Sequence, residues 1–554
     1  MDPGRQPSSL QIARNFDPPG PVVAHVSWHA TCSSADHMRT LMKLSMIALV
    51  GLAAACSGTT DDGSDTTEDN LTSAKARARK LTFTGYIYAD ADATDSDILE
   101  RVQSQTQTAF GSLRTAEVAV ASRELKGVDP STFARATVTV ADAASPKSTK
   151  TMLKVTYRYN DSAIVPVAMA TRTALSTAVM NPEYASQNSR ILTECTANDD
   201  EAREFENSIW YVFDPSVDGC HTAISAEQKT IDADAKKLTV GVIPQSEVDR
   251  LYVPITVKLS SSKTYGGTTY PEYDRLWAGG VKSNRLVISL VNGLIDDKPY
   301  SSMDQDSAWG EWIDEVRESV AGRNFTVTST DDNSDLSTYT VSGKTVKLPG
   351  GFMDVVNDNL PSGVSRSALL AAVANKVTYH WIHFEAPVKV KIGNASEKDV
   401  TIEIMTYFGS GGDQGPHKVA IKNSDVFIYN GHSYIGYGPL DPSRFTASDF
   451  PSSYQMLFID GCVSYNYYNH GYYDLKSGGT KNLDMIVNGM EAPSWHSGYA
   501  LGQFVHLLTD GSQASYLKLL NSAVDTDEVG GSLRVVDGEV DNAYKPTKTP
   551  IHVR

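Results

Sequence analysis

A histidine and a cysteine each follow a short apolar run in the last quarter of the chain. The run DVFIY at residues 425–429 leads to His432, and the run YQMLFI at residues 454–459 leads to Cys462. Short runs rich in β-branched and aromatic residues and bounded by glycine are typical of buried strands in a mostly parallel sheet. Catalytic groups gather at the carboxyl ends of such strands. We therefore interpret His432 and Cys462 as a candidate base and nucleophile.

The N-terminal region predicts export. Residues 44–55 form a short apolar segment that follows Arg39 and Lys43 and ends on Ala-Ala-Ala before Cys56. This order is typical of a secretory signal, and the segment is too short to span a membrane as a helix. It resembles a bacterial lipoprotein signal, which implies that Cys56 is acylated and anchors the protein in the cell envelope, with the outer membrane as the expected place. The alternative is ordinary cleavage with Cys56 as a bystander.

The other cysteines sharpen the interest in Cys462. We expect Cys32 to leave with the leader. Cys195 and Cys220 lie in polar, turn-rich surroundings and would form a disulfide in an oxidising compartment. Cys462 then remains alone, and a lone thiol in an exported protein is either a buried small apolar residue or a reactive group.

The chain of 554 residues is too long for one core, so we expect more than one domain. Residues 56–80 are polar and of low complexity, which predicts a flexible tether. The expected parts are a leader with its signal (1–55), this tether, an α+β domain (81–240), an α/β domain (245–525) and a C-terminal tail (526–554).

Charge and motifs limit the partners. The net charge of −17 argues against nucleic acid and against a basic membrane-binding face, so the lipid anchor is the one membrane contact expected. The acidic run at 90–95 lacks the glycine and the glutamate of a calcium loop. The glycine-rich loop at 409–412 lacks the lysine of a phosphate loop. His380 and His383 would point to opposite faces of a strand, so we expect neither a metal nor a cofactor.

The elements that must position the pair fall into two groups. In the first, a β-α-β-β-α-β order indicates a ferredoxin-like module, with strands at 81–89, 133–140, 151–159 and 208–213 and helices at 96–126 and 168–180. In the second, alternating strands and helices indicate an α/β sheet, with strands at 285–291, 324–328 and 400–408 and helices at 308–320 and 365–377.

The second group, with the Gly-His and Gly-Cys strand ends and the strand and helix that follow at 483–490 and 497–508, resembles the caspase, gingipain and CHAT-type cysteine peptidases of clan CD. The likeness covers residues 285–525 in outline and is specific across about 420–512. It implies a caspase-like, mostly parallel sheet flanked by helices, preceded here by the smaller α+β domain. It also implies a peptide or protein substrate.

The resemblance assigns roles to particular residues. His432 would be the general acid and base, Cys462 the nucleophile, and the backbone amides of Ser433 and Cys462 the oxyanion site. The family usually has glycine where Ser433 stands. The serine amide can still donate, but the residue would be strained if the site demands positive φ.

Several points stay open from the residues alone. Asn430 or Asp441 could orient the imidazole, and Asp460 could either disfavour the thiolate or cap the turn. The acidic balance slightly favours basic residues before the scissile bond. The alternative function is a catalytically inert surface lipoprotein for binding or adhesion, in which the tyrosine-rich stretch at 465–473 forms a recognition surface, although it would equally suit the rim of a substrate pocket.

Overall fold

The computed structural model describes residues 71–261, 268–296, 298–330, 335–468, 470–492, 497–523 and 533–554. The expected signal, the expected lipidation at Cys56 and most of the expected tether lie outside these ranges. No helix within them is long and apolar enough to cross a membrane. All of the described residues belong to one compact unit.

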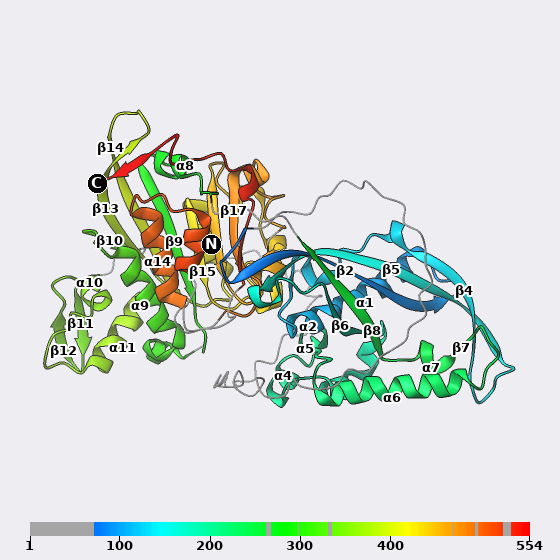
Figure 1. Ribbon diagram of the computed structural model, residues 1–554. Helices are drawn as coiled ribbons and strands as arrows, with labels where there is room; N and C mark the ends of the chain where they lie inside the picture. The colour runs from blue at the N-terminus through cyan, green and yellow to red at the C-terminus, as the bar shows by residue number, and fades with distance from the viewer. Residues whose placement is uncertain are drawn as a thin grey trace, which may run out of the picture. The chain divides into compact units, whose positions relative to one another are not determined.

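A mixed ten-stranded sheet forms the second half of the molecule (Figure 1). Its order is β1-β18-β17-β16-β15-β9-β14-β13-β10, with β19 paired to β13. The five strands from β17 to β14 are parallel to their neighbours in that series. The bounds are β1 Leu71–Thr72, β9 Arg285–Gly293, β10 Thr326–Thr330, β13 Trp381–Ile392, β14 Lys398–Gly409, β15 Val426–Asn430, β16 Gln455–Asp460, β17 Leu483–Asn488, β18 Arg534–Asp537 and β19 Ile551–Val553. The expected α/β class with parallel strands is confirmed.

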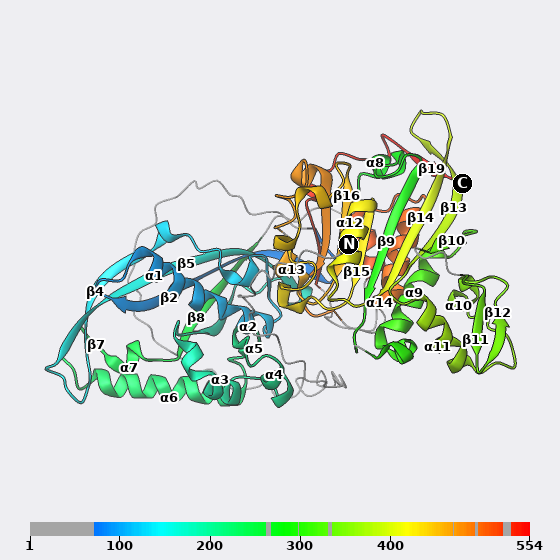
Figure 2. The ribbon, with the colours of Figure 1, turned by 180° about the vertical axis from the view of Figure 1, so that it is seen from behind.

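Helices cover both faces of this sheet. Figure 1 shows α9 (Ser307–Val320) and α14 (Ser497–Thr509) on one face, and Figure 2 shows α12 (Gln414–Asn423) on the other. Strand β9 shows why both faces need cover: Ile288 packs in the core under α9 and α14, while its neighbour Val287 packs in the core under α12. A strand buried on both sides needs apolar residues on both faces, and residues 286–288 and 290–291 of β9 supply them.

A second, seven-stranded sheet contains β6-β8-β2-β5-β4-β7 in that order, with β3 paired to β5. The bounds are β2 Ala76–Asp90, β3 Ala119–Val120, β4 Ala134–Ala141, β5 Thr149–Pro166, β6 Ala174–Met180, β7 Val242–Pro244 and β8 Tyr252–Ser261. Helices α1 (Asp95–Gln107) and α2 (Ala109–Arg114) bury the expected apolar stripe, which includes Ile98, Val102, Phe110 and Leu113. We call residues 76–261 the N-terminal module.

Three expected elements of this module are wrong. The helix expected at 96–126 ends at Arg114, and the segment beyond it turns into the short strand β3. The helix expected at 168–180 is the strand β6, whose residues pair along their whole length with β8. The strand expected at 208–213 is a helical turn, α5 (Ile209–Val212), packed closely on Gly111 of α2. Tertiary pairing overrides weak local preference in these short segments. The ferredoxin-like arrangement, which rested on them, stays a prediction.

The sheets also extend beyond the expected domain limits. Strand β8 belongs to the seven-stranded sheet although it lies after residue 240, and β18 and β19 of the expected tail complete the ten-stranded sheet. The expected disulfide is present: Cys195 at the end of α3 is bonded to Cys220 in α6. The remaining elements are α3 Asn188–Glu194, α4 Asp199–Glu204, α6 Asp218–Ala235, α7 Gln245–Val248, α8 Tyr273–Ala278, α10 Phe352–Val356, α11 Arg366–Val377, α13 Ser464–Tyr468, α15 Tyr516–Ser522, β11 Thr338–Val341 and β12 Lys344–Lys347.

Candidate functional site

His432 and Cys462 follow adjacent, parallel strands at the same edge of the sheet. Strands β15 and β16 pair so that Asn430 lies opposite Asp460, and His432 and Cys462 each come two residues later. Strand β9 flanks β15 on its other side, with Asn292 opposite Asn430. The carboxyl ends of β9, β15 and β16 therefore meet at one edge, where an open α/β sheet carries its ligands.

Two glycines let the loops at this edge approach one another. A Cβ atom on Gly431 would lie 2.6 Å from the hydroxyl oxygen of Tyr429, which itself donates a hydrogen bond to the carbonyl of His432. A Cβ atom on Gly461 would lie 3.2 Å from the carbonyl oxygen of Gly431. A side chain at Gly431 would collide with Tyr429, and one at Gly461 would press on the loop after β15.

Ser433, which stands where the resembled family has glycine, is not strained. Its φ is −88° and its ψ is −9°, an ordinary right-handed helical conformation. Its hydroxyl donates a hydrogen bond of 2.6 Å to the carbonyl of Cys462, and its own carbonyl accepts one of 2.8 Å from Tyr468. Among the described residues its amide donates no hydrogen bond, so this N–H is uncommitted.

The backbone strain lies next to Ser433 and next to Cys462 instead. Tyr434, Ile435 and Val463 have φ values of 51°, 45° and 54°. Non-glycine residues, and β-branched ones above all, rarely adopt this region, and each such residue costs on the order of 1–3 kcal/mol. Such strain persists only where the surrounding contacts impose it, and here it marks both loops that carry the pair.

The imidazole of His432 is held by the loop after β9. Its Nε2 lies 3.2 Å from the carbonyl oxygen of Ile295. Because a carbonyl only accepts, Nε2 carries the proton and Nδ1 of the neutral ring is left as the basic atom. The amide of Ile295 in turn donates to the buried carboxylate of Asp306 at 2.9 Å, and Asp306 also caps α9 through the amide of Ala308.

The thiol of Cys462 is protonated in this conformation. Burial, and to a lesser extent the nearby charge of Glu491, raises its pKa to about 12. The sulfur contacts the carbonyl oxygen of Ala492 at 3.9 Å. Within the described ranges no hydrogen bond joins Cys462 to His432. The thiol therefore requires a change in its surroundings before it can ionise near neutral pH.

Asp460 and Asp441 have partners other than the pair. Asp460 is fully buried and forms an ion pair of 2.9 Å with Arg534, so it faces β18 and does not cap the turn. Asp441 binds Arg123 of the N-terminal module at 3.1 Å. The contact that orients the imidazole comes from Ile295, so neither Asp441 nor Asn430 supplies it.

A buried acid lies between β9 and α9. Glu315 accepts a hydrogen bond of 2.7 Å from the side chain of Asn292, which is the residue opposite Asn430. Burial, with a smaller contribution from the charge of Asp460, raises the pKa of Glu315 to about 8. Glu315 is therefore mostly a neutral donor or acceptor below that pH.

The tyrosine-rich stretch does not form an exposed recognition surface. Tyr465, Tyr467, Tyr468 and Tyr472 are all buried, and they pack in the core that lies under α12. Two of the hydroxyls support backbone: Tyr468 donates to the carbonyl of Ser433, and Tyr472 donates to the carbonyl of Leu440. These tyrosines therefore stabilise the loop after β15.

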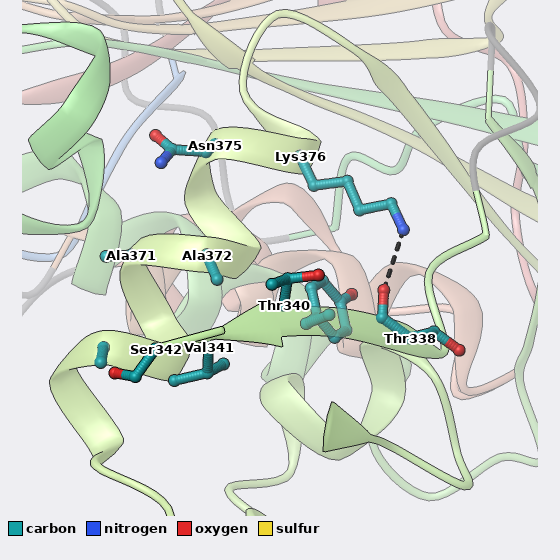
Figure 3. Close-up of a pocket in the computed structure, with 10 residues that line it drawn as sticks. Thr338, Thr340, Val341, Ser342, Ala371, Ala372, Asn375 and Lys376 are labelled. Carbon is teal, nitrogen blue, oxygen red and sulfur yellow. Dashed lines mark hydrogen bonds between the residues drawn. The ribbon is translucent and has the colours of Figure 1, made fainter. Parts of the chain in front are cut away.

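A hollow in the surface lies away from the pair. It has a volume of about 570 Å³ and separates β11 from α11, and Figure 3 shows that small residues such as Ala371 and Ala372 face it. None of the residues that line it belongs to the loops of His432 or Cys462. No group of side chains among the described residues could hold a metal ion, and His383 contacts Glu403 of the neighbouring strand at 3.2 Å.

The contacts of Ile295, Asp306 and Glu491 did not follow from the sequence. Asp306 could have been found as a helix cap, since aspartate precedes an apolar-periodic segment there. The other two show no local signal. Comparison with protein-family models, with curated proteins and with solved structures finds no match for this chain.

Proposed function

We propose that this protein is a cysteine peptidase that cleaves peptide bonds with His432 and Cys462. The observation that carries the proposal is the parallel pairing of β15 with β16. The two strands end level with each other, so the loops that carry the base and the nucleophile begin side by side at the same edge of the sheet. The order of strands β14-β9-β15-β16-β17-β18, with the last one antiparallel, also suits the caspase-like sheet that the sequence resembles.

The chemistry follows from the residues at the edge. The Cys462 thiol gives its proton to Nδ1 of His432, and the sulfur attacks the carbonyl carbon of the substrate. The amides of Ser433 and Cys462 would stabilise the oxyanion, and the uncommitted N–H of Ser433 supports this role. The C–N bond then breaks as His432 protonates the leaving amine. Water adds to the thioester, gives its proton to His432, and the C–S bond breaks to release the acid and restore the thiol.

An inert binding lipoprotein is the second candidate. The raised pKa of Cys462 favours it, since a thiol with a pKa of about 12 is a poor nucleophile at neutral pH. The strain at Val463 and Ile435 favours the peptidase, because strained backbone concentrates at functional sites. Under either function we propose anchoring of the exported protein in the bacterial envelope through a lipid on Cys56.

The test is labelling of the thiol by peptidyl acyloxymethyl ketones, read by intact mass and peptide mapping. We expect Cys462 to label faster than the thiol of a free peptide, and His432→Ala to slow the reaction at least tenfold, within the usual contribution of general acid–base catalysis. His221→Ala, at an exposed histidine of the N-terminal module, is the matched control and should label normally. Labelling no faster than that of the free peptide rules out the peptidase.

A further inference from the structure

An ion pair between distant parts of the chain lies beside the thiol. Nη1 of Arg114, at the end of α2 in the N-terminal module, binds Oε1 of Glu491, just after β17, at 2.5 Å. The hydroxyl of Tyr211 donates to the same carboxylate oxygen at 3.3 Å, and the Arg114 guanidinium lies 4.7 Å from the centre of the Tyr211 ring. Arginine and carboxylate joined by a charged hydrogen bond form one of the stronger polar contacts in proteins.

Glu491 belongs to the immediate surroundings of Cys462. The amide of Val463 donates to the carbonyl of Met490 at 3.0 Å, and the sulfur of Cys462 contacts the carbonyl of Ala492. Residues 490–492 therefore run alongside residues 462–463, and Glu491 is the residue between the two that make these contacts. Its negative charge adds to the raised pKa of the thiol.

The N-terminal module fills the space next to these residues. A Cβ atom on Gly489 would lie 2.8 Å from the Cβ of Ala119. A cavity of about 10 Å³ remains, room for about one water molecule. It is lined by Phe110, Arg114, Val118, Ala119, Val120, Val463, Gly489 and Met490. A substrate side chain can enter this cavity only if the residues of the N-terminal module that line it move away.

The same segment is fixed on the histidine side as well. Arg123 binds Asp441 and the carbonyl of Gly436, both in the loop after β15. Between the two arginines, Asn466 of α13 donates to the carbonyls of Val120 and Ser122. Residues 114–123 thus connect the loops that flank the pair, with one arginine at each end.

We propose that Glu491 selects a cationic substrate side chain for the pair of His432 and Cys462, and that Arg114 occupies this position in the same chain. The inference rests on the proposed peptidase function. The exposures suit it: the Arg114 side chain is 15% exposed and that of Glu491 is 41% exposed, so the carboxylate keeps an open side from which a second guanidinium can approach. A substrate arginine would then replace Arg114 at the same oxygen atoms.

Two probes that differ in charge alone test the selectivity. Acyloxymethyl ketones ending in arginine or in its neutral isostere citrulline are applied to the full chain and to Arg114→Ala. We expect Arg114→Ala to react at least tenfold faster than wild type with the arginine probe, and to prefer it over the citrulline probe about tenfold, as expected for a hydrogen bond between charged groups. In Arg114→Ala/Glu491→Gln the preference should fall to about one.

The controls separate this position from general loosening of the fold. Arg190→Ala removes an arginine of the same module that pairs with Glu194, and it should leave the labelling at the wild-type rate. Arg114→Met keeps the apolar stem over the Tyr211 ring and replaces Arg114→Ala if thermal melting shows that the alanine variant is unfolded. Equal rates with both probes in a folded Arg114 variant overturn the proposal and leave the ion pair a purely structural contact.

A binding measurement separates this inference from the peptidase itself. In Arg114→Ala/Cys462→Ala, fluorescence anisotropy compares a short peptide containing arginine with its citrulline analogue. Preferential binding of the arginine peptide, without labelling of Cys462 in Arg114→Ala, would support the cation site and exclude the peptidase function. Labelling by both probes alike, without preferential binding, retains the peptidase and overturns the role of Glu491.

Discussion

The hydroxyl of Ser433 donates a hydrogen bond of 2.6 Å to the carbonyl oxygen of Cys462. This bond fastens the loop after β15 to the loop after β16. The residue that departs from the resembled family pattern therefore joins the base loop to the nucleophile loop. Its φ of −88° places no demand for glycine on this position.

Replacement of Ser433 should weaken the join between the two loops. We expect Ser433→Ala to lower the free energy of unfolding by about 1 kcal/mol, the usual net value of one hydrogen bond, and Ser433→Gly by somewhat more because glycine gains backbone freedom in the unfolded chain. Both variants should label more slowly at Cys462. Urea unfolding and the labelling rate measure the two effects. Ser448→Ala, at an exposed serine further along the same connection between β15 and β16, should change neither quantity. Faster labelling of Ser433→Gly would show that serine impairs the site.

Asp306 should matter through the position of His432. Its carboxylate accepts from the amides of Ile295, Asp296 and Ala308 at 2.9–3.0 Å, and the carbonyl of Ile295 contacts the imidazole. We expect Asp306→Ala to cost about 2 kcal/mol or more in unfolding free energy, since it removes a helix cap and leaves buried amides unsatisfied.

A role in positioning predicts more than this loss of stability. Labelling of folded Asp306→Ala by a peptidyl ketone should slow and change its pH profile, because His432 loses its fixed neighbour. Asp354→Ala, which removes a carboxylate that binds the amide of Gly350 in an exposed turn, is the control. An unchanged pH profile in Asp306→Ala would contradict a positioning role.

The ion pair of Asp460 and Arg534 leads us to expect that a second substitution restores the stability lost when one partner is removed. The two side chains are 0% and 3% exposed. Arg534→Met leaves a buried carboxylate without its partner, and removing one member of a buried pair costs about 3–5 kcal/mol. Asp460→Asn in the Arg534→Met background removes that charge and should recover most of the loss. Thermal or urea unfolding of the two single variants and the double variant measures the coupling. Additive losses in the double variant would contradict it.

Glu315 predicts a loss of stability as the pH rises. Its pKa in the folded protein is about 8, against a usual value of 4.5. Below pH 4.5 the carboxyl is protonated in both states and its contribution is fully present. Between pH 4.5 and 8 only the unfolded state ionises freely, so this contribution is lost as the pH approaches 8. The total is at most about 5 kcal/mol, since each tenfold change in an acid constant corresponds to ~1.4 kcal/mol.

Glu315→Gln should remove that pH dependence. The amide keeps a hydrogen-bond partner for Asn292 and cannot ionise, so the variant should lose less stability than wild type between pH 4.5 and 8. Urea midpoints at four or five pH values measure the difference. Glu318→Gln, at a carboxylate of the same helix, is the matched control. Parallel pH curves for wild type and Glu315→Gln would contradict the raised pKa.

The sequence predicts the ten-stranded sheet better than the seven-stranded sheet. The runs at 426–429 and 456–459 are apolar throughout, and a strand buried on both faces in a parallel sheet needs that composition. Segment 168–180 has no such signal, because β6 is specified by its partner β8 and its residues alternate only partly between buried and exposed. The disulfide followed from the count of cysteines.

At the site, the sequence indicates the functional side chains but not the contacts between distant segments. His432, Ser433 and Cys462 each stand next to a recognisable strand end. Arg114 reaches Glu491 across 377 positions of the chain, and no local pattern marks such a pair. The contact between His432 and Ile295 depends on a main-chain oxygen, which every residue type provides.

The apolar cluster under α12 contains residues from both sheets, among them Phe110 and Val120 of the N-terminal module and Tyr467 and Leu457 of the other half. Proteolytic loss of the whole N-terminal module would therefore expose an apolar surface and would not produce an active enzyme. Any release of the Glu491 carboxylate must be a small, reversible movement around residues 114–123. Calorimetry should accordingly record a single melting transition for the two sheets, because they share this apolar cluster.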